Sequence, residues 1–275
     1  MDNEIQSAAI TGMYNDYESA SNVTSKCPGS RCTWEPYTTL ALCYSVEDVT
    51  STLVVHKQGQ VDRTVFSPAA LDQYRAPPKE TSDDWGWFDT FWAAAVYFGN
   101  IDVPWSYNLS HVADAFIVVF DPCKNPDLDN GNSTAHWNNT SVWTAYRGTF
   151  SLCLQTLNSS FAGSSMNTTI IQTKQAVDLH WDDVEGYCTS IDGDPVRYCM
   201  DGYAVHSLGA TIESVFSGSA SLLNGGSNEY TTDWIFVLAQ DILGPSPNLC
   251  NKGPHVGLNG FSRRLNNLAT SLTNT

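Results

Sequence analysis

Two short runs of carboxylates are the residues of this sequence best suited to chemistry. Asp182, Asp183 and Glu185 form the first run, and Asp192 and Asp194 form the second. Two carboxylates act as acid and base on a glycosidic bond when the fold sets them about 5 to 9 Å apart. The sequence does not fix that separation, and a chain with 29 acidic residues contains such clusters by composition alone. We therefore expect no catalytic residue, and a carbohydrate-active enzyme is the alternative.

The second feature with a possible ligand is the densest aromatic segment, which holds Trp85, Trp87 and Trp92. Tryptophans usually fill a core, but their amphipathic rings also stack on sugars. An open groove lined by these side chains beside two converging carboxylates would favour a carbohydrate-active or carbohydrate-binding protein. A closed surface would favour a non-enzymatic domain that senses, binds or scaffolds.

The sequence indicates no metal and no cofactor. The segment 127–131 resembles the start of a calcium loop, but its glycine falls one place early and no closing glutamate follows. The six histidines show no His-x-x-x-His or Glu-flanked spacing, which argues against zinc. No Gly-x-Ser-x-Gly elbow, phosphate loop or dinucleotide fingerprint occurs. We predict a turn at 127–131.

The charge of the chain limits its partners. With 29 acidic and 13 basic residues, the net charge is -16. This charge repels phosphate groups, so neither a nucleic acid nor an anionic lipid surface is expected as the direct partner. We expect a protein or carbohydrate ligand, whose identity the sequence leaves open together with the oligomeric state.

Cysteines and glycosylation motifs indicate the secretory pathway. The eight cysteines are an even number, and Asn-x-Ser/Thr motifs occur seven times. Together they predict an oxidising route to an extracellular or cell-surface location. We expect glycans at Asn22, Asn108, Asn158 and Asn167, and on at most one of the overlapping Asn138 and Asn139. The motifs begin at Asn22, Asn108, Asn132, Asn138, Asn139, Asn158 and Asn167.

The chain reads as one domain, 1–275, because no Pro/Gly/Ser-rich linker divides it. Its clearest pattern is a hairpin, in which even positions from Val142 are mostly apolar and odd positions from Thr169, including Ile171, face in. The polar turn with the motifs at Asn158 and Asn167 must then project into solvent. Further strands are predicted at 52–56, 61–66, 115–120 and 234–239, and helices at 67–74 and 203–223.

Each terminus is predicted to form an amphipathic helix, within 1–15 and 257–275. In the second, an apolar stripe lies opposite a polar face with Arg263, Arg264, Asn266 and Asn267. The helix either docks on the core or leads to a bilayer. The pattern as a whole predicts a mainly β or α+β fold, a disulfide-stapled antiparallel sheet or sandwich with short marginal helices. The stripe consists of Leu258, Phe261, Leu265, Leu268 and Leu272.

The longest apolar runs fall far short of the roughly 20 residues that a membrane helix needs. Met1 is followed by Asp2 and Glu4 rather than by a basic region and an apolar core. We therefore expect an excised or mature soluble portion, with Met1 as a possible added start.

Three motifs resemble the ectodomain of a family of fungal membrane proteins of unknown function, whose signature is Cys-Pro-Thr-Gly-Asn-Cys-Thr-Trp. The resemblance implies an outward-facing domain between membrane helices, and the family supplies no activity. The matching residues are Cys27, Pro28, Gly29, Cys32, Thr33 and Trp34 in the first motif, Cys43, Asp48, Val49 and Thr50 in the second, and Cys153, Gln155 and Thr156 in the third.

The resemblance also implies a disulfide scheme. Where the family has two further cysteines, this chain has Val46 and Gly148, so the family is inferred to pair those positions and this chain to pair Cys43 with Cys153. Since 148 and 153 alternate to opposite faces of a regular strand, we expect a bulge or a strand end there. The remaining bridges are expected to be Cys27 to Cys32, Cys188 to Cys199, and Cys123 to Cys250.

Overall fold

The protein is an α+β domain built on a large antiparallel sheet, seen here in a computed structural model. The structure describes residues 30–58, 63–68, 88–97, 111–120, 143–162, 165–176, 180–182, 186–190, 196–222, 228–230, 237–238, 241 and 257–273. This architecture confirms the predicted fold class.

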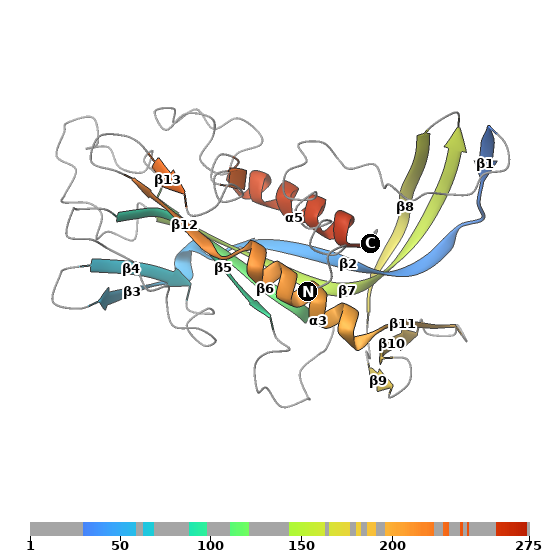
Figure 1. Cartoon of the computed structure of the whole chain (residues 1–275), viewed down its shortest axis with the longest axis horizontal. Helices are drawn as coiled ribbons and strands as arrows, with labels where there is room; N and C mark the ends of the chain where they lie inside the picture. Colours follow the sequence, from blue (N-terminus) through green and yellow to red (C-terminus); the bar gives the residue numbers. More distant parts are fainter. Residues whose placement is uncertain are drawn as a thin grey trace.

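The strands of the large sheet follow the order β1-β7-β6-β5-β12-β13, and β2 and β8 also pair with β7 (Figure 1). Two smaller sheets contain β11-β10-β9 and β3-β4. The strands of the large sheet are β1 (Arg31–Thr33), β2 (Tyr37–Asp48), β5 (Phe88–Tyr97), β6 (His111–Phe120), β7 (Trp143–Ala162), β8 (Ser165–Gln175), β12 (Gly218–Leu222) and β13 (Asn228–Tyr230). The other elements are η1 (Thr50–Thr52), β3 (Leu53–Gln58), β4 (Arg63–Pro68), β9 (His180–Asp182), β10 (Gly186–Ser190), β11 (Arg197–Met200), α3 (Gly202–Val215) and α5 (Leu258–Thr273).

Strand β7 is the axis of the sheet, because four strands pair with it. Along one edge, β6 pairs with its first half up to Ser151, and β8 takes over from Cys153. Along the other edge, β2 pairs as far as Leu157 and β1 follows from Ser160. The first half of β7 therefore lies in the wider part of the sheet, with β6, β5, β12, β13 and the end of β2, which we call the body. The second half of β7 forms a narrower extension with β8, β1 and the start of β2. We call this extension, residues 31–41, 153–162 and 165–175, the arm.

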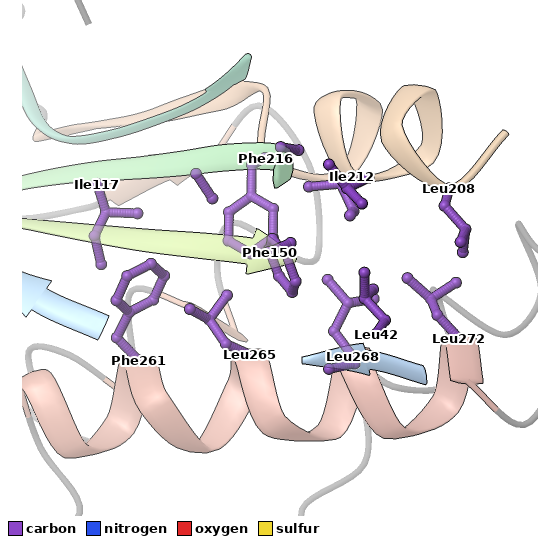
Figure 2. Close-up of a cluster of buried hydrophobic side chains, with 14 of the residues drawn as sticks. Leu42, Ile117, Phe150, Leu208, Ile212, Phe216, Phe261, Leu265, Leu268 and Leu272 are labelled. Atoms are coloured by element: carbon purple, nitrogen blue, oxygen red, sulfur yellow. The ribbon is translucent and has the colours of Figure 1, made fainter. Parts of the chain in front are cut away.

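Helices α3 and α5 cover one face of the body. Helix α3 contacts β5 and β6, and α5 contacts β2 and β7. Figure 2 shows their apolar side chains converging on Phe150 of β7. The rings of Phe150 and Phe216 are 6.3 Å apart, and Phe216 meets Phe261 edge-on at 6.2 Å. Burial of these rings joins sheet and helices in one core.

The ends of the two helices are fixed by polar side chains. Asp201 caps α3 by accepting a hydrogen bond from the backbone N–H of Tyr203 at 2.7 Å. At the end of α5, the Thr273 hydroxyl accepts a hydrogen bond from the Leu42 N–H of β2 at 3.0 Å. The C-terminal helix is thus tied to the sheet at its last turn.

The apolar stripe of α5 is confirmed, since Phe261, Leu265, Leu268 and Leu272 are buried. Two members of the predicted polar face are buried as well, because Arg264 and Asn267 are each only 2 % exposed. The guanidinium of Arg264 donates from Nε to Asp241, and Arg263 Nη2 donates to the same carboxylate at 2.5 Å. This ion pairing allows the polar flank of the helix to be buried.

Several predicted elements are confirmed and others are wrong. The β3–β4 hairpin, the buried strand β6 and the β7–β8 hairpin are present. The predicted helix start at Ser67 lies instead inside β4, and the predicted helix over 203–223 ends at Val215 and gives way to β12. Val237 and Leu238 are helical rather than part of a strand. A short apolar run fits a buried strand and a buried helix equally well. The predicted helix at 1–15 lies outside the described residues.

Candidate interaction surface

The structure describes only two of the residues singled out for carbohydrate chemistry. Asp182 ends β9, where it pairs with Gly186 of β10. Trp92 lies within β5, between Val118 of β6 and Ser219 of β12. The remaining carboxylates and tryptophans, Asp183, Glu185, Asp192, Asp194, Trp85 and Trp87, lie outside the described residues, as does the predicted turn at 127–131. In the part of the chain that is described, no group of three or more His, Cys, Asp or Glu is placed to hold a metal ion.

The arm leaves the body at the disulfide between Cys43 and Cys153, which is present as predicted. Cys153 is fully buried, at the residue where β8 replaces β6 along β7. The two cysteines are diagonal neighbours across the β2–β7 ladder, with Cα atoms 5.8 Å apart. This bond fastens the base of the arm.

The expected bulge at this bridge is absent. The β2–β7 register is unbroken from Tyr37 to Asp48. Val46 lies directly opposite Gly148 on the helix-covered face, whereas Cys43 and Cys153 meet on the other face. One regular ladder therefore accommodates a pair on each face, and no irregularity is needed.

A second disulfide joins Cys188 to Cys199, as predicted. These residues are directly opposite each other on β10 and β11. Cys32 is also disulfide-bonded, and its partner lies outside the described residues, as do Cys27, Cys123 and Cys250. The disulfides indicate that the chain folds in an oxidising compartment.

One face of the arm carries two glycosylation motifs. Asn158 pairs with Thr169 and Asn167 pairs with Ser160, so both asparagines point to the same face as diagonal neighbours. Such neighbours lie about 7 to 8 Å apart. Both are exposed. Alternation along β7 places them on the side of the sheet that the helices cover in the body. The other five motifs, at Asn22, Asn108, Asn132, Asn138 and Asn139, lie outside the described residues.

The opposite face of the arm carries a row of apolar side chains across three strands. Tyr37 of β2 is opposite Leu157 of β7, which is opposite Ile170 of β8. A bulge in β8 adds Ile171, because Thr169 and Gln172 on either side of the isoleucines both face the helix side. We call Tyr37, Leu157, Ile170 and Ile171 the apolar row.

The apolar row is open to solvent. Tyr37 is 43 % exposed, Ile170 56 % and Ile171 57 %. The prediction that Ile171 faces into the core is wrong, because its side chain is exposed on the face opposite the helices. The arm also projects beyond both helices, as Figure 1 shows. A polar pair borders the row, where Ser159 Oγ lies 3.0 Å from Thr168 Oγ1.

The arm is nearly free of charge. It contains the single acid Glu35 and two basic residues, Arg31 and Lys174. The rest of the chain therefore carries 28 of the 29 acidic residues. The arm is a neutral surface on a strongly acidic protein.

The apolar row lies on the face of the sheet opposite the helices. In the body, this same face holds a charged cluster. Arg147 donates to Asp114 from Nε at 3.0 Å and from Nη2 at 2.5 Å, and to Glu47 from Nη1 at 3.1 Å. Thr149 Oγ1 donates to Asp114 at 2.8 Å, and the guanidinium lies 5.8 Å from the centre of the Phe116 ring. Asp114 has no exposed surface, whereas Glu47 is 57 % exposed.

The carboxylates of this cluster raise the pKa of Arg147. Desolvation by burial lowers the pKa of Arg147, but hydrogen bonds and charge interactions with Asp114, and then with Glu47, outweigh it and the pKa is raised. The cluster joins β2, β7 and β6 by side chains in addition to the ladder. Sequence reasoning missed it, although a lone acid inside the apolar run of β6 was the available signal.

Comparison with protein-family models, with curated proteins and with solved structures finds no match for this chain. None of the helices among the described residues combines the length and apolarity needed to cross a membrane.

Proposed function

We propose that this chain is a non-enzymatic, glycosylated ectodomain that acts at the cell surface by binding or scaffolding. The observation that carries the proposal is the arm, which bears two glycosylation motifs on one face and exposed apolar side chains on the other. Solvent-exposed apolar side chains gathered in one place commonly mark an interaction site.

In this proposal, one face of the arm carries glycans and the other face binds the ligand. Glycans on Asn158 and Asn167 keep the helix-side face in solvent and cover it. The apolar row on the other face remains accessible to a protein or carbohydrate ligand. The Cys43–Cys153 disulfide supports the same view, because it anchors the strands that present the row.

The resemblance to the fungal family extends the proposal to membrane attachment. In that arrangement, the terminal segments 1–15 and 257–275 lie near the bilayer, and the domain faces outward. The docking of α5 on the sheet would then hold the core close to that attachment point.

Assays of polysaccharide hydrolysis test the proposal against the carbohydrate-active alternative. The glycosylated chain, secreted from a eukaryotic host, is incubated with common polysaccharides, and the release of reducing sugar is measured. We expect no release above a buffer control. Turnover that disappears with Asp183→Asn or Asp194→Asn would overturn the non-enzymatic function.

A further inference from the structure

Strand β8 presents an open edge. It pairs with β7 along one side, and among the described residues no strand pairs with its other side. All its residues from Thr169 to Gln175 are exposed. Backbone N–H and C=O groups along such an edge are available to another strand.

The sequence of β8 favours pairing with another strand. In the segment 168–173, Thr168, Thr169, Ile170, Ile171 and Thr173 are β-branched, and only Gln172 is not. The segment has no charge, proline or glycine, and β-branched residues of this kind are typical of strands that associate at their edges. Lys174 is the one charged residue of β8, so charge gives the edge little protection, and the single bulge at Ile171 is its only irregularity against β7.

From these features we infer that β8 pairs antiparallel with β8 of a second copy of this chain, about a two-fold axis near Ile170 and Ile171. The inference rests on the proposed function, in which the arm is the binding surface. A two-fold axis perpendicular to the sheet extends it edge to edge and keeps equivalent faces on the same side. The two apolar rows then become one continuous row, with isoleucines of both copies as cross-strand neighbours.

The glycans do not obstruct this arrangement. Asn158 and Asn167 of both copies lie on the face opposite the joined apolar rows. Glycans attached there stand away from the sheet and leave the edge of β8 free. The same glycans cover the helix-side face of the arm. A second copy can therefore associate with the arm through the edge of β8 but not through that face.

Charge favours a second copy at this place. Two chains with a net charge of -16 repel each other wherever their acidic surfaces meet. The arm holds one acid and two basic residues, so contact through it brings two nearly neutral surfaces together. Antiparallel pairing about a two-fold axis also gives the two copies of β8 equivalent backbone hydrogen bonds.

Sedimentation equilibrium of the secreted, glycosylated chain over about 1 to 100 µM tests the inference. We expect a reversible dimer. The double variant Ile170→Lys, Ile171→Lys should raise the dissociation constant of the dimer by at least about tenfold. Val196→Lys is the matched control, because Val196 is an exposed apolar residue outside the arm, at 49 %. It should dimerise as the wild type does.

Hydrogen exchange of the peptide 165–176 provides a second readout. Exchange there should slow as the wild-type concentration rises and should not slow in the double lysine variant. A wild-type chain that stays monomeric throughout this range, or a dimer unaffected by the double variant, would overturn the inference. A monomer without hydrolytic activity contradicts only the self-association, whereas hydrolysis contradicts the proposed function whatever the oligomeric state.

Discussion

At the scale of single residues, Asp114 shows how the sheet tolerates a buried charge. Its carboxylate lies inside β6 with no exposed surface, and Arg147 and Thr149 of the adjacent strand donate three hydrogen bonds to it. A buried carboxylate costs several kcal/mol in the absence of such partners. The ion pair therefore links β6 and β7 by side chains in addition to the backbone ladder.

Removal of Arg147 should destabilise the fold far more than removal of the exposed Glu47. We expect Arg147→Met to lower the free energy of unfolding by about 3 kcal/mol, because a buried carboxylate loses its cationic partner. Glu47→Gln should cost below about 1 kcal/mol, since that pair is exposed. Urea denaturation measures both, and equal losses would show that Asp114 does not depend on Arg147.

Gly148 permits the close approach of α5 to β7. A Cβ atom at this position would lie 2.2 Å from Leu265 Cδ1 and 3.2 Å from Phe261 Cζ, and both side chains are fully buried. We expect Gly148→Ala to destabilise the protein by about 1 to 3 kcal/mol through overpacking.

A double-mutant cycle with Leu265→Ala separates this clash from backbone effects. Because Leu265→Ala removes the nearest atom, Gly148→Ala should cost at least about 1 kcal/mol less in that background. The same cost in both backgrounds would argue that the helix does not limit residue 148.

At the scale of elements, the β7–β8 hairpin was predictable because its alternation is long and regular. Tyr146, Phe150 and Leu152 face the helices as the pattern requires. The same alternation failed at Ile171, since a period of two identifies a face but not whether anything covers it. Ile171 lies on the face opposite the helices, and whether another element packs on a given face is decided by tertiary packing.

The C-terminal helix α5 was likewise predictable only in part. The spacing of its leucines predicted the buried stripe, but burial of Arg264 depends on Asp241, a residue 23 positions away. Likewise, the apolar spacing continued past Val215, where the chain leaves α3 and forms β12 beside β5. Pairing with β5 outweighed the local helical pattern, because strand pairing depends on distant residues.

The two described disulfides should contribute unequally to stability. Cys43 and Cys153 are 110 residues apart in sequence, whereas Cys188 and Cys199 are 11 apart. In the chain-entropy model, Cys43→Ala with Cys153→Ala should cost about 5 kcal/mol, and Cys188→Ala with Cys199→Ala about 3 kcal/mol. Chemical denaturation of the two double variants tests this order, which an equal or reversed cost would contradict.

At the scale of the whole molecule, the arm differs from the rest of the chain in charge. Nearly all acidic residues lie outside the arm, and both described glycosylation motifs lie on one of its faces. Composition predicted the oxidising compartment but gave no sign of the apolar row, because Tyr37, Leu157 and Ile170 are far apart in sequence. Only the register of β2, β7 and β8 brings them together.

Site-specific mapping of glycans tests this account most directly. The chain is secreted from a eukaryotic host, its N-glycans are removed enzymatically in heavy-oxygen water, and the labelled aspartates are located by mass spectrometry. We predict occupancy of both Asn158 and Asn167, and no label at Asn259, an exposed asparagine outside any glycosylation motif. Unmodified asparagine at both 158 and 167 would contradict a glycan-covered face of the arm, and with it the proposed surface ectodomain.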